Sequence, residues 1–336
     1  MKVLVTGGTG FVGAWTAKAV AEAGHQVRFL VRDPARLTTS AAQIGLDTSD
    51  YVVGDIGDAY STTAAMDGCD AVIHSAALVS VVRAAEDAAA MLRVNLDGAH
   101  NVLGVAAERG LDPIVYVSSF TALFRPGLGT VSADLPVVGG SDGYGQSKSA
   151  VENYARSLQA TGAPVAITYP GMVLGPPAGN QFGEAAKGVE AAVKLRGLPG
   201  GRGAAWTAVD VREVAALHAA LLTPGEGPRR YMAGGRRIPV AELTAMLREV
   251  TGLPLSRYRV PDRVLRGVGR IVDRVGHRLP FDAPMTGSAM QYYTQMPPTD
   301  DTPSEVELGI RYRDARETLA DTVTGLRRVG RLRAGV

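Results

Sequence analysis

Residues 6–13 read TGGTGFVG and lie between a short apolar run, 2–5, and an amphipathic stretch, 12–23. Glycine-rich turns in this strand–turn–helix context bind dinucleotides. Gly7 permits the tight turn, Gly10 lets the backbone approach a pyrophosphate, and Gly13 allows the helix to pack closely on the strand. The N-terminus of the helix then presents free N–H groups and the positive end of its dipole to the anion. The predicted cofactor contacts in this turn are Gly7, Thr9, Gly10, Phe11, Val12 and Gly13.

Outside this motif, the first 170 residues alternate short apolar runs with longer amphipathic stretches. The runs are almost continuously apolar, which favours strands that are covered on both faces. Such alternation predicts an α/β fold with a Rossmann-type, doubly wound parallel sheet. The predicted strands are 2–5, 27–31, 51–53, 71–74, 114–117 and 165–169. The predicted helices are 12–23, 34–44, 61–66, 84–108 and 147–161.

After residue 170 the pattern changes, because 171–180 and 197–203 are rich in Gly and Pro and predict loops around a substrate pocket. Helical periodicity returns at 208–222, 240–251 and 314–329, and 297–303 predicts a loop. We therefore expect a cofactor-binding core of residues 1–170, completed by about 204–222. Residues 171–203 and 223–336 are expected to form a smaller C-terminal lobe that binds the substrate.

Composition excludes several classes of protein. The 336 residues are 46% hydrophobic and carry a net charge of only +2, so the charge gives no reason to expect a nucleic-acid partner. One cysteine, Cys69, rules out an internal disulfide framework, and the five histidines lack metal-binding spacings, so we predict no metal site. His74 is expected to be a packed strand-end residue. Without a leader pattern or a 20-residue apolar span, the chain is predicted to be cytoplasmic.

Three further motifs follow the glycine turn in order: Asp55-Ile56, His74-Ser75-Ala76-Ala77 and Tyr144-Gly-Gln-Ser-Lys148. With that turn, they make residues 1–222 resemble the extended short-chain dehydrogenase/reductases, which include nucleotide-sugar epimerases, dihydroflavonol reductases and 3β-hydroxysteroid dehydrogenases. The resemblance implies that Asp55 accepts a hydrogen bond from the adenine amino group while the Ile56 backbone meets the ring. It also implies that Ala76 and Ala77 let the cofactor pass close to the fourth strand. Pro170 and Val173, in a Pro-Gly-x-x-x-Gly-Pro segment, are similar to the residues that pack on the nicotinamide.

The end of the second predicted strand indicates which nicotinamide cofactor binds. NAD-using members of the family carry an acid where this chain has Val31, and Arg32 comes next. A guanidinium would clamp a 2′-phosphate that a carboxylate would repel. We therefore favour NADP(H), although NAD(H) stays open because Asp33 could bind a ribose hydroxyl. Asp33 could equally cap the helix that begins at Pro34.

Tyr144 and Lys148 are four residues apart, so they share one face of a helix. Reduction of a carbonyl leaves an alkoxide that needs a proton, and the Tyr144 phenol is the predicted donor. Lys148 is expected to lower the pKa of that phenol and to bind the nicotinamide ribose. The resemblance implies a catalytic Ser or Thr about 25 residues before the tyrosine, so Ser119 is chosen as the hydroxyl that polarises the carbonyl oxygen. Thr121 is the reserve candidate.

The substrate is less constrained. Tyr169 and Met172 replace the Arg and Asn of sugar-nucleotide enzymes, and an apolar pocket mouth is predicted from Phe124, Leu128, Val137, Val138 and Phe182. We therefore expect an NADP(H)-dependent oxidoreductase acting on a ketone or secondary alcohol of a small lipophilic substrate. The alternatives are a nucleotide-sugar epimerase or dehydratase with tightly bound NAD, and a non-catalytic cofactor-binding regulator. The resemblance implies either a homodimer that pairs through the two long helices 84–108 and 147–161 or a monomer.

One C-terminal stretch, 261–279, is strongly basic and amphipathic. Arginines recur at 263, 266, 270, 274 and 278, while Val and Ile residues lie on another face. The stretch predicts either a helix with a solvated basic face or a weak contact with a membrane surface or an acidic ligand.

Overall fold

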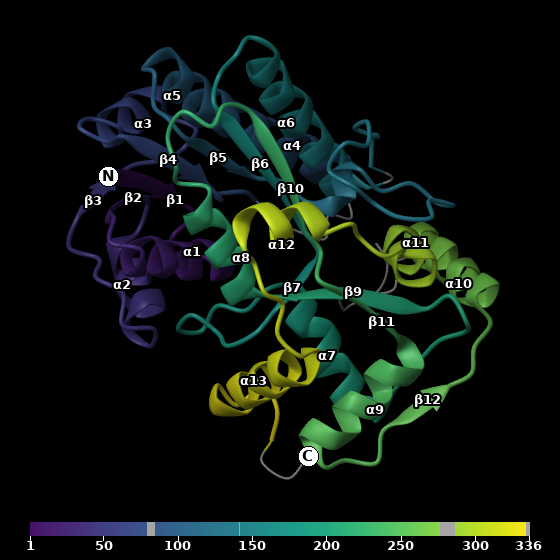
Figure 1. Cartoon of the computed structure of the whole chain (residues 1–336). Coiled ribbons are helices and arrows are strands. Elements are labelled where there is room, and N and C mark those ends of the chain that lie inside the picture. The colour runs from purple at the N-terminus through teal and green to yellow at the C-terminus, as the bar shows by residue number, and fades with distance from the viewer. Residues whose placement is uncertain (79–84, 141, 276–285, 334–336) are drawn as a thin grey trace.

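A seven-stranded sheet forms the centre of the larger lobe in the computed structural model, which describes residues 1–78, 85–140, 142–275 and 286–333 (Figure 1). Its order is β10-β6-β5-β4-β1-β2-β3, and every neighbouring pair is parallel. This confirms the predicted fold class and all six predicted strands. The strands are β1 (Lys2–Thr6), β2 (Gln26–Val31), β3 (Tyr51–Val53), β4 (Ala71–His74), β5 (Ile114–Val117), β6 (Val165–Pro170) and β10 (Arg229–Ala233).

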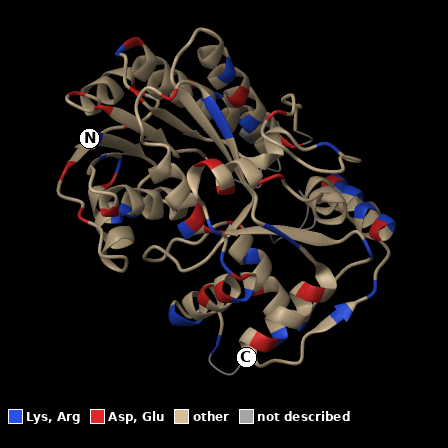
Figure 2. Ribbon diagram, viewed as in Figure 1, with Lys and Arg blue, Asp and Glu red and all other residues tan. Residues whose placement is uncertain are grey.

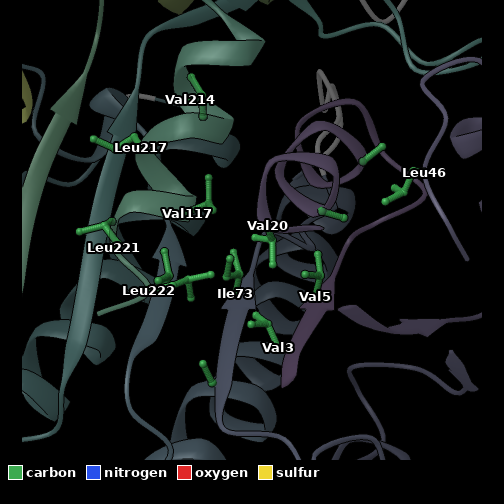
Figure 3. Close-up of a cluster of buried hydrophobic side chains, with 14 of the residues drawn as sticks. Val3, Val5, Val20, Leu46, Ile73, Val117, Val214, Leu217, Leu221 and Leu222 are labelled. Atoms are coloured by element: carbon green, nitrogen blue, oxygen red, sulfur yellow. The ribbon is translucent and has the colours of Figure 1, made fainter. Parts of the chain in front are cut away.

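Helices cover both faces of this sheet, which is why most of its strands are almost continuously apolar. Val3 and Val5 of β1 pack with the helices on one face, whereas Leu4 packs on the other. Figure 3 shows the first of these clusters, in which Val20 and Val214 approach the sheet from two helices. On this face lie α1 (Phe11–Glu22), α2 (Pro34–Ala42) and α8 (Val211–Ala220). On the other face lie α3 (Ala59–Ala65), α4 (Ala85–Ala99), the π-helical turn η1 (His100–Gly104), α5 (Val105–Glu108) and α6 (Gly143–Ala160).

The smaller lobe has its own apolar core, formed around Trp206, Leu243 and Leu319. It contains a three-stranded sheet, β11-β9-β7, and a two-stranded sheet, β12-β8. The strands are β7 (Met172–Leu174), β8 (Gly197–Pro199), β9 (Ala205–Asp210), β11 (Arg236–Pro239) and β12 (Ser256–Tyr258). The helices are α7 (Ala185–Lys194), α9 (Val240–Thr251), α10 (Asp262–Val275), α11 (Gly287–Gln295), α12 (Thr302–Leu308) and α13 (Ala315–Arg328).

The structure differs from the sequence expectations in several places, and two of them are the strands β7 and β8, which lie inside the predicted loops 171–180 and 197–203. β10 joins the large sheet although it lies in 223–336, which the sequence assigned to the smaller lobe. It was not predicted as a strand because it begins with two arginines, which an edge strand can expose to solvent. Residues 208–210 end strand β9 instead of beginning a helix. α6 begins at Gly143, four residues early, and α12 begins within the predicted loop, with a proline in its first turn. Position 84 and positions 276–279 of the predicted helices lie outside the described residues.

Among the helices that the structure describes, none combines the length and the apolar character that crossing a membrane requires.

Candidate functional site

The predicted site residues follow the carboxyl ends of the parallel strands, which share one edge of the sheet. β1 pairs with β2 on one side and with β4 on the other, so the chain changes direction across the sheet between β1 and β4. Ligands of doubly wound sheets bind in the crevice at this switch point. The glycine turn follows β1, Ala76 and Ala77 follow β4, and Ser119 follows β5. The edge therefore brings together segments that are more than 100 residues apart.

The glycine turn has the shape that a pyrophosphate needs. Gly7 has φ +79°, and a Cβ on Gly13 would lie 2.2 Å from the Gly7 carbonyl oxygen, so neither position accepts a larger residue without movement. A Cβ on Gly10 would meet only the Gly7 oxygen, at 3.3 Å, so its other side is open. Gly10 is also the N-cap of α1 and provides no side-chain cap, while the first turn holds no acid. The free backbone N–H groups at the N-terminus of α1, together with the open side of Gly10, fit the negative charge of a dinucleotide.

Two of the residues predicted to bind the adenosine part of the cofactor, Arg32 and Asp55, lie side by side. Arg32 follows β2 and Asp55 follows β3, and an Arg32 Nη1 to Asp55 Oδ2 distance of 3.6 Å joins two side chains that are 74% and 46% exposed. Asp33 caps α2, because its Oδ1 accepts from the Ala35 and Arg36 amides. Arg32 is thus the cationic side chain at this strand end, and Asp33 takes the capping role. Ile56 is held by its carbonyl, which accepts from Asn101 Nδ2 at 2.8 Å.

His74 is a packed strand-end residue, as expected. Its Nδ1 lies 2.8 Å from Thr6 Oγ1, and burial lowers its pKa to about 3, so it stays neutral at physiological pH. The loop after it lies directly on the glycine turn, because a Cβ on Gly7 would be 2.7 Å from the Ala76 nitrogen. Ala76 and Ala77 are therefore beside the glycine turn, where a small side chain leaves room for a ligand.

Tyr144 lies in the first turn of α6, where Asp142 is the N-cap and accepts from the Gly145 amide at 2.6 Å. Ser119 is close enough for a hydrogen bond from its side chain to lower the pKa of Tyr144, but burial outweighs this and raises that pKa overall. The charges of Asp142 and Glu184 act in the same direction as burial. The expectation that Lys148 lowers the pKa of Tyr144 is therefore wrong: that pKa is raised, because removing the phenol from water outweighs the one influence that lowers it, the Ser119 hydrogen bond.

Ser119 is itself oriented by Thr121, whose hydroxyl and amide donate to Ser119 Oγ at 3.0 and 3.3 Å. Thr121 therefore supports Ser119, and its own hydroxyl is committed to that bond. Ser119 also caps the short turn η2 (Phe120–Ala122), with an extended backbone at φ −158°. These contacts fix the Ser119 hydroxyl at the end of β5.

Lys148 lies one helical turn after Tyr144 and is buried. Its ammonium donates to the Val117 carbonyl oxygen at 3.0 Å and lies 5.4 Å from the centre of the Tyr116 ring. Burial lowers the pKa of Lys148 to about 8, and the charge of Glu152 opposes that change. The side chain is therefore held at the end of β5 with a proton that it can release near neutral pH.

Behind Lys148 lies a buried polar network that the sequence reasoning missed. Glu152, fully buried, accepts from the Tyr169 hydroxyl at 2.5 Å and from Arg156 Nε at 2.8 Å through the same oxygen, Oε1. Arg156 Nη2 also donates to the Tyr169 hydroxyl, at 3.0 Å. Glu152 Oε2 makes no hydrogen bond within the described residues. The signal was present in the sequence, since Tyr144, Lys148, Glu152 and Arg156 recur every four residues.

An aromatic wall, formed by Phe120, Phe124 and Tyr292, borders the site. Tyr292 of α11 meets the Phe120 ring edge-on at 5.8 Å and the Phe124 ring at 4.9 Å. Phe120 is the residue after Ser119, and a Cβ on Gly145 would lie 3.3 Å from the Tyr292 hydroxyl. The smaller lobe therefore reaches the two segments that carry Ser119 and Tyr144.

Of the residues predicted for the apolar pocket mouth, Phe124 and Leu128 share one apolar cluster, and Val137 and Val138 are partly buried. Phe182 belongs elsewhere, because it packs in the core of the smaller lobe, where the Arg331 guanidinium lies 5.5 Å from its ring. Pro170 ends β6 and Val173 lies in β7, so the segment that the resemblance linked to the nicotinamide connects the two lobes.

Within the described residues, no group of three His, Cys, Asp or Glu side chains could hold a metal ion.

Comparison with known proteins identifies several relatives. A model of the NAD dependent epimerase/dehydratase family matches residues 3–234. A Synechocystis protein provisionally named dihydroflavonol 4-reductase is 30% identical, over 95% of this chain and 92% of its own. The sterol demethylase protein B of Methylococcus capsulatus is 28% identical, over 98% and 99%. Among solved structures, a UDP-glucose-4-epimerase from Stenotrophomonas maltophila with bound NAD superposes with a TM-score of 0.78 at 22% identity, covering 98% of this chain and 99% of that one.

Proposed function

Since the chain belongs to the NAD dependent epimerase/dehydratase family and is an NAD(P)-dependent oxidoreductase or epimerase, we propose that it is an NADP(H)-dependent reductase or dehydrogenase. Its substrate would be a small lipophilic ketone or secondary alcohol. The observation that carries the proposal is that Ser119 lies beside Tyr144 and that Lys148 is held on the Val117 carbonyl at the carboxyl end of β5, next to the aromatic wall.

The glycine turn and the flanking strand ends are the residues that would hold the cofactor, and the nicotinamide would supply the hydride donor or acceptor. Gly7, Gly10 and Gly13 give the pyrophosphate a close approach to the N-terminus of α1. Asp55 and Ile56 stand at the adenine end, next to Arg32. Pro170 and Val173 lie where the chain passes from the large sheet into the smaller lobe.

The protein's part of the reaction is proton transfer at the substrate oxygen. In the direction of reduction the Tyr144 hydroxyl donates its proton to the developing alkoxide, and its high pKa keeps that proton in place until then. The Ser119 hydroxyl donates a hydrogen bond to the same oxygen, and Thr121 holds Ser119 in position. Lys148, held one turn away by the Val117 carbonyl, would bind the nicotinamide ribose.

Apolar surroundings support the lipophilic substrate class. Phe120, Phe124 and Tyr292 give the site an aromatic border. Tyr169, which stands where sugar-nucleotide enzymes carry an Arg, is buried and bonded to Glu152 and Arg156 instead of being available to a ligand. Two relatives are named for a dihydroflavonol and a sterol, both ring compounds that dissolve poorly in water.

Preference for NADP(H) rests on Arg32. Its pair with Asp55 is long and exposed, so it contributes little and would be exchanged readily for a 2′-phosphate. Arg32→Ala should weaken NADPH binding about tenfold or more, the scale of charge-assisted hydrogen bonds, and leave NADH binding nearly unchanged. Binding is measured by fluorescence titration. Equal losses for the two cofactors would refute the assignment.

The reaction is tested with lipophilic ketones, sterols and sugar nucleotides, following the absorbance of NADPH and NADH at about 340 nm. We expect NADPH-dependent turnover of a ketone, and Tyr144→Phe should reduce kcat by about 100-fold or more while NADPH still binds. Interconversion of a sugar nucleotide without added cofactor would replace the proposal with an epimerase. A cellular function that survives Tyr144→Phe would replace it with a cofactor-binding regulator.

A further inference from the structure

The outer helix α10 carries an apolar stripe that nothing within the described residues covers. Val264, Val268 and Ile271, spaced at four and three residues, are 46%, 37% and 57% exposed. They are separate from the side of α10 that packs inward, where Leu265 and Gly269 are buried. Three large aliphatic side chains in one row on a solvent-facing helix indicate a surface that contacts an apolar partner.

Arginines flank this stripe. Arg263, Arg270 and Arg274 are exposed and fall seven and four residues apart, so they form a second row beside the apolar one. Within the described parts of the chain, no carboxylate pairs with any of the three. Figure 2 shows basic residues recurring along α10, at the right of the view. The fourth arginine, Arg266, turns inward and donates to Thr294 Oγ1 at 3.0 Å.

Both acids of α10 accept hydrogen bonds from backbone amides of neighbouring segments. Asp262 accepts from the Gly201 and Gly203 amides at 3.1 and 2.9 Å, and Asp273 accepts from the Gly287 amide at 3.0 Å. Both carboxylates therefore anchor the helix to its own lobe and do not neutralise the exposed arginines. The exposed surface of α10 thus combines aliphatic side chains with three arginines that are unpaired within the described residues, and its one exposed acid, Asp273, is bonded to the Gly287 amide.

We propose that α10 docks on the surface of an anionic lipid bilayer. The stripe of Val264, Val268 and Ile271 would enter the boundary between headgroups and acyl chains, and Arg263, Arg270 and Arg274 would meet lipid phosphates. An amphipathic helix that lies in the interface has this division between aliphatic and basic residues. The inference goes beyond the proposed reaction and does not depend on it. Since α10 packs on α11, which carries Tyr292, docking puts the lipid on the outer side of the lobe that borders the site (Figure 1).

Co-sedimentation of the full chain with vesicles tests this. We expect binding to mixed phosphatidylcholine and phosphatidylglycerol vesicles at low salt, and little binding to phosphatidylcholine alone or at high salt. Substituting Arg263, Arg270 and Arg274 together by Gln should lower the partition coefficient about 100-fold, since each basic residue near an anionic surface contributes about fivefold. Ile271→Glu should also release the protein. A matched triple substitution of Arg109, Arg311 and Arg333 by Gln should bind like the unmodified chain.

Four outcomes would overturn the proposal: no binding to anionic vesicles, equal loss in the matched control, undiminished binding of the Arg263/Arg270/Arg274 variant, or undiminished binding of Ile271→Glu. A concentration-dependent dimer that Ile271→Glu dissociates, without vesicle binding, would assign the stripe to a second copy of the chain. Turnover of a water-soluble ketone is measured on the same variants and should not change. A failure of the proposed reaction therefore shows in that assay and leaves the vesicle result intact.

Discussion

The buried charge of Lys148 should lower the free energy of unfolding of the protein. Its pKa falls from the usual 10.5 to about 8, because its ammonium is buried at the end of β5. A tenfold change in proton affinity corresponds to about 1.4 kcal/mol, so the charged side chain destabilises the folded chain by about 3 kcal/mol. Replacement by Met removes this penalty and loses the hydrogen bond to the Val117 carbonyl, which contributes about 1 kcal/mol. Lys148→Met should therefore be about 2 kcal/mol more stable at pH 7 and inactive.

The pH dependence separates this cause from a packing effect. Below pH 8 both the folded and the unfolded chain hold the proton, so the penalty is fully present. Between pH 8 and 10.5 the folded chain releases the proton while the unfolded chain retains it, so the stability of the unmodified protein rises. The advantage of Lys148→Met should thus shrink to nearly zero at about pH 10. Urea unfolding followed by circular dichroism at pH 7 and pH 10 measures both proteins. A difference in unfolding free energy that is the same at both pH values would refute the reasoning.

Three further substitutions test neighbouring parts of the structure. Glu152→Gln removes the negative charge that raises the pKa of Lys148. The pKa near 8 in the pH profile of kcat/KM should therefore shift to a lower value. If Glu152 had a purely structural role, the substitution would reduce the folded fraction without moving that pKa. His218 has a pKa lowered to about 3 by burial, so only the unfolded chain takes up its proton as the pH falls from 6.5, and this should cost about 2 kcal/mol at pH 5. His218→Gln should make acid unfolding in urea correspondingly less steep, and an unchanged slope would contradict the assignment. Gly13→Ala should abolish NADPH binding in a fluorescence titration, because its Cβ would meet the Gly7 oxygen at 2.2 Å, whereas Gly129→Ala, whose Cβ meets nothing within 4 Å, should bind normally.

The large sheet was predictable because its central strands β1, β4, β5 and β6 are buried on both faces and therefore almost continuously apolar. β10 escaped because Arg229 and Arg230 begin it at an edge of the sheet, where polar side chains reach solvent. The start of α6 escaped for another reason. Gly143 and Gly145 are poor helix formers, yet the Asp142 cap fixes the first turn and makes Tyr144 helical. At Tyr144, the capping hydrogen bond of Asp142 therefore outweighs the low helix propensity of the two glycines.

The candidate site was predictable where a residue's role depends on its position along a motif, and less so where it depends on partners from elsewhere. The structure places Ser119 beside Tyr144 and holds Lys148 on the Val117 carbonyl at the end of the same strand, while the catalytic roles of these residues stay predictions. The direction of the Tyr144 pKa did not follow from the spacing, because burial depends on the whole fold. Tyr292 could not be linked to the site from sequence, since α11 lies almost 150 residues after Tyr144 and reaches it only through the smaller lobe.

The polar network along α6 explains how a buried lysine can keep its proton near neutral pH. Lys148, Glu152 and Arg156 follow one another at single helical turns, so their charges alternate along one face. Glu152 favours the charged form of Lys148, and Arg156, together with the Tyr169 hydroxyl, stabilises the Glu152 carboxylate in a place that water does not reach. Removing either partner of Glu152 should therefore weaken its support of Lys148. Arg156 and Tyr169 thus affect the pKa of Lys148 through their hydrogen bonds to Glu152, and not through contact with the substrate.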